Sequence, residues 1–126
     1  MNRKTFIESL GATCRNWYWS WSFVNHAEKF VIFGAWERRE NKDGCALILS
    51  DTWKKGDNGR LQAGYTQAIE HIGLIKDKGY ILKIFMMEYS EDRKDKNGNG
   101  PACIKSFSTE TFVRKLKYEN EQWFAC

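Results

Sequence analysis

Two runs of consecutive apolar residues constrain the fold of this chain more than any other feature. Residues 30–36 read FVIFGAW and residues 45–49 read CALIL, without a charged side chain in either run. A strand with one wet face alternates apolar and polar residues, so short unbroken runs predict strands that are covered on both faces. A chain of 126 residues can supply that cover within one unit, and we expect a single domain over residues 1–126.

An amphipathic helix over residues 61–78 is one expected part of that cover. Apolar side chains recur there at helical spacing, and Gly79 follows as a helix end; the positions are Leu61, Tyr65, Ala68, Ile69, Ile72 and Ile75. A short helix is predicted over residues 4–10, where Phe6 and Leu10 lie one turn apart. Another short helix is predicted within residues 107–116.

The remaining strands are predicted from alternating or apolar stretches at residues 16–24, 80–89, 101–104 and 122–125. A turn with an Asp-Gly pair at residues 41–44 favours a hairpin, so we expect the strands at 16–24, 30–36 and 45–49 to form a meander. Together these elements predict an α+β fold. A curved mixed β-sheet or partial β-barrel would pack against one long helix and one or two short helices.

Composition excludes several classes of protein. With 42% hydrophobic and 29% charged residues, the chain is globular rather than disordered, and no apolar run approaches the length of a membrane span. The N-terminal segment lacks the apolar core of a signal peptide, so we expect a cytoplasmic protein with no membrane partner. The four scattered cysteines, Cys14, Cys45, Cys103 and Cys126, are then predicted to be reduced thiols.

Residues 16–25, NWYWSWSFVN, concentrate the largest side chains of the chain. In a strand, Trp17, Trp19 and Trp21 would project to one side, and Ser20 and Ser22 to the other. Core packing explains most of these rings, because half-buried strands favour aromatics. The small hydroxylated face, with further tryptophans near strand ends, also suits a pocket for a flat hydrogen-bonding ligand such as a nucleobase.

That second interpretation gives a set of candidate base-binding residues: Trp19, Trp21, Ser22, Asn25, Trp36, Ser50, Asp51 and Trp53. Asp51 ends an apolar strand, so a partly buried carboxylate there needs a donor, either a backbone cap or a ligand. Basic residues in the loops are candidates for contacts with the backbone of a nucleic acid: Arg38, Arg39, Lys54, Lys55, Arg60, Arg93, Lys94 and Lys96. Acids are interspersed, and solvated loops explain each basic group singly about as well.

Motifs of catalysis are missing from the sequence. There is no phosphate-binding loop, no nucleophile elbow and no zinc-protease helix, and His26 and His71 are the two histidines. Both are expected to be exposed titratable groups rather than general bases. We therefore expect a binding protein with no catalytic residue, no metal site and no cofactor.

The order of the apolar and aromatic segments resembles a known family. WSWSFVN, GAWE, ALILSxxWxxGxxGR and GYxxAIEHIxLI follow one another and precede a terminal WFA. This order resembles the modified-DNA-reading domains of McrA-type, HNH-containing (type IV) restriction endonucleases, and it is most similar to their SRA-like reader. The likeness runs from about Asn16 to Ala125. It implies an SRA/PUA-like fold in a restriction or defence system.

The resemblance also implies a ligand, namely duplex DNA that carries 5-methylcytosine or 5-hydroxymethylcytosine. SRA domains flip the base out of the duplex, whereas another McrA-type reader leaves it stacked. Carried over to this chain, the resemblance makes Asp51 a candidate acceptor for the exocyclic amine of cytosine. It makes residues 90–100 a candidate groove probe.

One departure from the family limits the expected activity. The paired histidines and cysteine knuckle of the HNH nuclease are absent from this sequence. The chain would be a reader excised from a longer protein or a separate reader that recruits an HNH nuclease. Two alternatives remain, a small nucleotide-binding protein and a protein-interaction module with an aromatic docking face.

Overall fold

The computed structural model describes residues 2–17, 20–36, 44–55, 59, 61–90 and 103–126. Two helices, one 3₁₀ turn and eight strands lie in these ranges. In chain order they are α1 (Arg3–Ser9), β1 (Ser22–Asn25), β2 (Phe30–Trp36), β3 (Ala46–Ser50), η1 (Asp51–Lys54), α2 (Ala63–Lys78), β4 (Ile81–Ser90), β5 (Cys103–Phe107), β6 (Phe112–Arg114), β7 (Leu116–Glu119) and β8 (Gln122–Ala125).

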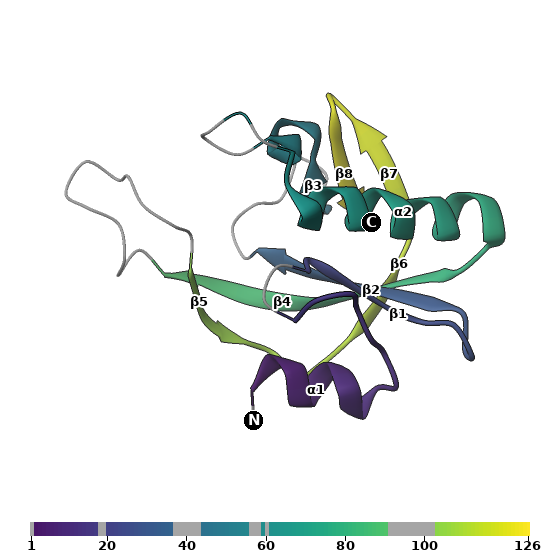
Figure 1. Ribbon diagram of the computed structural model, residues 1–126, viewed down its shortest axis with the longest axis vertical. Coiled ribbons are helices and arrows are strands. Elements are labelled where there is room, and N and C mark those ends of the chain that lie inside the picture. The colour runs from purple at the N-terminus through teal and green to yellow at the C-terminus, as the bar shows by residue number, and fades with distance from the viewer. Residues whose placement is uncertain (1, 18–19, 37–43, 56–58, 60, 91–102) are drawn as a thin grey trace.

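The strands form two sheets (Figure 1). In the first sheet the order is β1-β2-β4-β5, and β6 also pairs with β4. β1 and β2 form an antiparallel hairpin, whereas β2 and β4 run parallel from Phe30↔Ile81 to Trp36↔Met87. A parallel pair needs a long crossover, and the chain between β2 and β4 contains β3, η1 and α2. In the second sheet β8 lies between β3 and β7, with both pairs antiparallel.

β2 is covered on both faces, as its unbroken apolar run predicts. Val31 and Phe33 belong to a buried cluster that includes Ala68 and Ile72 of α2. Their neighbours along the strand belong to a second buried cluster with Phe6 and Ile7 of α1, because successive side chains of a strand point to opposite faces. Figure 1 shows α1 and α2 on opposite sides of the first sheet.

The long helix is confirmed with a later start, at Ala63 instead of residue 61. Gln62 takes the N-cap position, and Gly79 ends the helix with φ 73°, in the left-handed region that glycine enters without strain. Neither described helix is long and apolar enough to cross a membrane.

The expected α+β class is therefore confirmed, with one mixed and one antiparallel sheet that do not close into a barrel, one long helix and one short helix. The strands expected near residues 30–36, 45–49, 80–89, 101–104 and 122–125 are present as β2, β3, β4, β5 and β8. The short N-terminal helix is present as α1.

The predicted strand over residues 16–24 is wrong in extent. β1 begins only at Ser22. Before it the backbone turns, because the Ser20 N–H donates to the Asn16 carbonyl (2.9 Å) and the Asn16 N–H donates to the Ser20 hydroxyl (3.2 Å). Trp17 still reaches the core, where its ring stacks on Phe23 at 5.6 Å.

Two other expectations about topology are wrong. The three-strand meander does not form, because β3 leaves the first sheet and pairs with β8. The helix predicted within residues 107–116 is replaced by β6 and the start of β7. The edge of β4 offers unpaired backbone groups, which Phe112–Arg114 satisfies as a strand.

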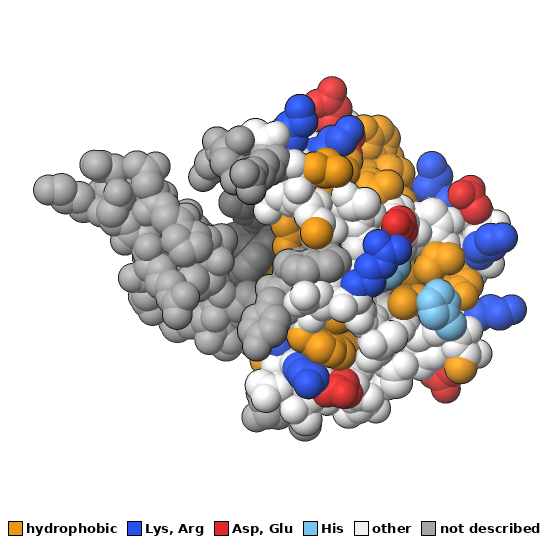
Figure 2. All heavy atoms as spheres, in the orientation of Figure 1, with side chains coloured by type: hydrophobic (Ala, Val, Ile, Leu, Met, Phe, Trp, Pro, Cys, Tyr) orange, Lys and Arg blue, Asp and Glu red, His pale blue; other side chains and the backbone are white. Residues whose placement is uncertain are grey.

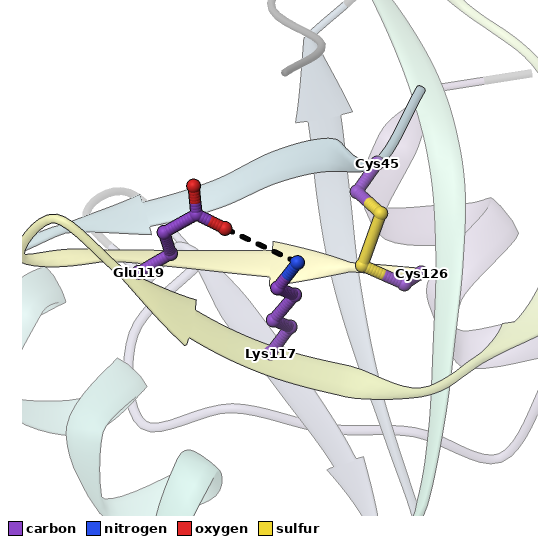
Figure 3. Close-up of a disulfide and its surroundings, with 4 residues drawn as sticks. All are labelled: Cys45, Lys117, Glu119 and Cys126. Carbon is purple, nitrogen blue, oxygen red and sulfur yellow. Dashed lines mark ion pairs between the residues drawn. A yellow bond between two sulfur atoms is a disulfide. The ribbon is translucent and has the colours of Figure 1, made fainter. Parts of the chain in front are cut away.

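The prediction that the cysteines are reduced is wrong for two of them. Cys45 and Cys126 form a disulfide (Figure 3). The register Ala46↔Ala125 between β3 and β8 places the two cysteines just beyond a paired position, with their Cα atoms 4.6 Å apart. Figure 3 also shows the ion pair of Lys117 and Glu119 on the adjacent strand β7 (3.1 Å). Cys14 is a free thiol.

Candidate functional site

A pocket lies between α2, β1 and the segment that precedes β1. It encloses about 390 Å³ and is lined by Thr13, Cys14, Arg15, Val24, His26, Gln67, Glu70, His71 and Leu74. The backbones of Thr13 and Val24 exchange two hydrogen bonds of 2.9 Å, which hold the preceding segment against β1. Pockets of small-molecule ligands have volumes of roughly 300–1,000 Å³, so this one is large enough for a nucleobase.

The wall that α2 contributes to the pocket is polar and buried. His71 is 7% exposed and Gln67 is 1% exposed. Nδ1 of His71 lies 2.5 Å from the hydroxyl of Ser22, which belongs to β1 and is fully buried. Oε1 of Gln67 is buried and has no hydrogen-bond partner among the described residues. A buried carbonyl oxygen without a donor is unfavourable, and a bound ligand could supply that donor.

His71 is neutral at ordinary pH. Burial is the largest cause that lowers the pKa of its imidazole to about 4, and the nearby His26 and Arg15 contribute to the same shift. The polar wall of the pocket thus combines a neutral imidazole with a neutral amide. This combination suits an uncharged hydrogen-bonding ligand.

Charged and apolar side chains complete the pocket. Arg15 and Glu70 form an ion pair of 2.7 Å, and their side chains are 61% and 49% exposed. His26 is also exposed, and its Nδ1 hydrogen-bonds the Tyr80 hydroxyl (3.0 Å). Figure 2 shows histidine atoms beside apolar side chains at the right of the face that it presents, with basic and acidic groups interspersed. Among the described residues, no group of His, Cys, Asp and Glu side chains could hold a metal ion.

Asp51 has its donors from within the protein. Oδ1 accepts a hydrogen bond from the Tyr65 hydroxyl (2.8 Å), and Oδ2 accepts one from the Tyr118 hydroxyl (2.5 Å). Burial, helped by the Asp51 carboxylate, raises the pKa of Tyr65 to about 12. The hydrogen bond to Asp51 also raises the pKa of the exposed Tyr118. Both carboxylate oxygens are thus occupied by tyrosine hydroxyls, which are neither a backbone cap nor a ligand.

The tryptophans that the structure describes pack against neighbouring rings. Trp21 and Trp53 meet edge to face, with ring centroids 6.2 Å apart, and both are partly buried against the main core cluster. Trp123 packs on Tyr118 at 4.4 Å and carries the Lys76 ammonium 5.4 Å from its ring centre. These contacts favour the interpretation of Trp21 and Trp53 as core residues.

The other predicted base-binding residues are dispersed. The side chain of Asn25 donates to the Leu10 carbonyl (3.2 Å) and accepts from the Glu28 N–H (2.9 Å). The Ser50 hydroxyl binds the hydroxyl of Thr52 at 2.8 Å. Ser22 lies behind His71, beside the pocket but outside its lining. Trp19 and the side chain of Trp36 lie outside the described residues.

Of the predicted backbone contacts, Lys54 and Lys55 are exposed at the end of η1. The other six lie outside the described residues: Arg38, Arg39, Arg60, Arg93, Lys94 and Lys96. The candidate groove probe at residues 90–100 also lies outside them, apart from the backbone of Ser90.

The sequence prediction missed the pocket and was wrong about His71, which is buried rather than exposed. A signal was present in the helix. Gln67, His71 and Leu74 repeat at intervals of four and three residues, so they share one helix face, immediately beside the apolar stripe of Ala68 and Ile72. Polar residues that follow the edge of a buried stripe can line a cavity.

Three comparisons with known proteins found no match to this chain. No protein-family model matches it, no curated protein matches it, and no solved structure matches it. The resemblance to SRA-like readers therefore stays a prediction from the sequence.

Proposed function

We propose that the chain binds duplex DNA that carries a modified cytosine, with the modified base in the pocket between α2 and β1. The observation that carries this proposal is the buried polar wall of the pocket, where a neutral imidazole lies near an amide oxygen that has no partner among the described residues. A nucleobase is flat, uncharged and rich in hydrogen-bonding groups at its edge. The resemblance to modified-cytosine readers supports the same ligand.

A base can reach this wall only after it leaves the helical stack. Extrusion of a nucleotide costs a few kcal/mol, and contacts in the protein have to offset that cost. The apolar side chains of Val24 and Leu74 and the polar side chains of Gln67 and His71 line the same cavity. This mixture provides both a surface for the ring and partners for its edge.

The charge of the described surface supports a moderate affinity for DNA that decreases with salt. The chain has a net charge of +4, and basic and acidic side chains are interspersed on the face shown in Figure 2. Lys54 and Lys55 are exposed and are not pocket residues, so they suit contacts with phosphates. Phosphate contacts position the DNA, and the pocket would supply the selectivity.

Fluorescence anisotropy with matched duplexes tests the proposal. The duplexes have one sequence and contain a single cytosine, 5-methylcytosine or 5-hydroxymethylcytosine. We expect at least tenfold tighter binding to one modified duplex, and weaker binding to all three as salt increases. The double variant Lys54→Glu/Lys55→Glu should weaken binding to all three duplexes by a similar factor. Equal affinity of the wild-type protein for all three would refute the proposal.

A free nucleoside or nucleotide is a second candidate ligand, because the same pocket volume and the same neutral wall suit it. Thermal stabilisation by free nucleosides, without any effect of duplex DNA, would favour this alternative. The docking-face alternative has less support, since the exposed large apolar side chains of the described residues are Leu61, Ile81, Val113 and Tyr118, none of them a tryptophan.

A further inference from the structure

We propose that Gln67 and His71 together select cytosine by the edge on which an amine donor lies beside a ring-nitrogen acceptor. This inference rests on the proposed function, because it assumes that the modified base enters the pocket. It adds the two side chains that recognise the base. It also moves that recognition from the tryptophan strand and Asp51 to the face of α2.

His71 enters the pair as a hydrogen-bond donor. A neutral imidazole has one N–H and one unprotonated nitrogen. Ser22 is fully buried, and among the described residues the partner of its hydroxyl is Nδ1 of His71. A buried hydroxyl needs an acceptor for its proton, so Nδ1 is the unprotonated nitrogen. The hydrogen is then on Nε2, which makes this nitrogen the donor that the pocket-lining ring offers a ligand.

Gln67 enters the pair as a hydrogen-bond acceptor. Its side chain is 1% exposed and lines the pocket, and no described residue donates to its Oε1. The terminal torsion of a glutamine amide is broad, so the oxygen can turn toward a ligand at little cost in free energy. An N–H group that reaches this wall would satisfy the oxygen.

The two side chains are spaced for one ring edge. Gln67 and His71 are four residues apart on α2, so they are neighbours on one helix face. Cytosine presents its amine donor next to the N3 acceptor. Thymine presents the O4 acceptor next to an N3–H donor, which is the reverse order. An acceptor from Gln67 beside a donor from His71 therefore matches cytosine and opposes thymine, where like groups would face each other.

A recognition role and a structural role of Gln67 predict different stabilities for Gln67→Leu. Leucine has a similar size and no polar atom, so it removes a buried oxygen to which no described residue donates. The folded protein should keep or increase its stability while it loses ligand recognition. If the amide instead stabilised the fold, the same change would lower the midpoint of thermal unfolding.

The test compares the wild type, Gln67→Leu and the matched control Gln62→Leu. Gln62 precedes α2, donates to the Trp53 carbonyl (3.2 Å) and does not line the pocket. Anisotropy is measured on two duplexes that carry 5-methylcytosine or thymine at one position opposite guanine. We expect the wild type and Gln62→Leu to prefer 5-methylcytosine at least tenfold, although the mismatched thymine is easier to extrude. Gln67→Leu should lose the preference and unfold at the same or a higher temperature.

Two failures of this test are distinguishable. If Gln67→Leu keeps the preference for 5-methylcytosine over thymine, the inference is wrong and the proposed function stands. If the wild type does not distinguish modified from unmodified cytosine, the proposed function is wrong. In that case thermal shifts with free 5-methylcytidine and 5-methyluridine decide the inference: stabilisation by 5-methylcytidine alone, lost in Gln67→Leu, supports it, and any other result overturns it.

Discussion

Helix α2 contributes to two polar clusters, one through Tyr65 and the other through Gln67. The two clusters differ in how many of their hydrogen-bonding groups have partners. Tyr65 of α2 donates to Asp51, whose second carboxylate oxygen accepts from Tyr118. On another face of α2, Gln67 keeps an oxygen without a partner among the described residues, beside a cavity of about 390 Å³. Both oxygens of the Asp51 carboxylate have donors within the protein, whereas no described residue donates to Oε1 of Gln67.

This difference separates stability from recognition. A cluster whose polar groups bond one another stabilises the fold, and its loss should lower the free energy of unfolding. A buried polar group without a partner costs about 1–3 kcal/mol of stability, so its presence in a folded protein calls for an explanation such as a bound ligand or water. We therefore expect changes near Asp51 to affect folding and changes near Gln67 to affect binding.

Reduction of the Cys45–Cys126 disulfide should cause the largest loss of stability. The loss should arise at the cluster of Asp51, Tyr65 and Tyr118. The bond joins residues 81 positions apart and connects β3, which leads into Asp51, with the end of β8. A closed loop of this length stabilises a protein by about 4 kcal/mol in the chain-entropy account. Denaturant unfolding with and without reductant should show a loss of this order.

Tryptophan fluorescence can locate the effect of reduction. Trp53 and Trp123 lie in or beside the sheet that the disulfide joins, so their emission should change before global unfolding. The control Cys14→Ser removes the thiol of Cys14 and should leave the response to reductant unchanged. A loss of DNA binding in the reduced but still folded protein would contradict the separation of the two clusters.

The sequence predicted the elements that depend on local pattern. The apolar run of β2 and the helical stripe of α2 carried enough information to place them, because burial on two faces or on one stripe determines each pattern. The pairing of β3 with β8, and hence the Cys45–Cys126 disulfide, depends on contacts between residues 81 positions apart. No local pattern records such a contact.

The site was less predictable than the fold for a similar reason. Asp51 was expected to need a donor, and it has two, but the donors are Tyr65 on a helix 14 residues later and Tyr118 on a strand 67 residues later. His71 was expected to be an exposed titratable group. Its burial depends on the fit of α2 against β1, where Ser22 meets the imidazole. Partnership between distant polar groups is a tertiary property.

Acid should lower the free energy of unfolding through His71 in the pocket, and this effect should be the second largest. The pKa of His71 is about 4 in the folded protein and 6.5 in the unfolded chain. Between these values, as the pH falls, the unfolded chain binds a proton that the folded protein does not bind. The stability contributed by neutral His71 is therefore present above pH 6.5 and is lost as the pH falls to about 4, by about 3 kcal/mol.

Variants of the two histidines check this assignment. His71→Gln should flatten the decrease in stability between pH 6.5 and 4, whereas His26→Gln, at an exposed position, should leave most of it. The comparison removes the common contribution of the carboxylates, which titrate in the same range. Chemical denaturation at several pH values gives the measurement. If the stability of the wild type and of His71→Gln changed equally with pH, the pKa of His71 would not be lowered in the folded protein.

Asp51→Ala should have the smallest of these effects and should leave recognition intact. It removes the acceptor of the buried Tyr65 hydroxyl, and loss of such a charge-assisted hydrogen bond costs about 2 kcal/mol. Tyr118→Phe is the milder control, because its hydroxyl belongs to an exposed side chain. Neither residue lines the pocket, so both variants should keep the wild-type preference among modified and unmodified duplexes. If Asp51→Ala abolished that preference at unchanged stability, recognition would belong to Asp51, as the resemblance implies, because its carboxylate would then exchange the tyrosine hydroxyls for the amine of the base.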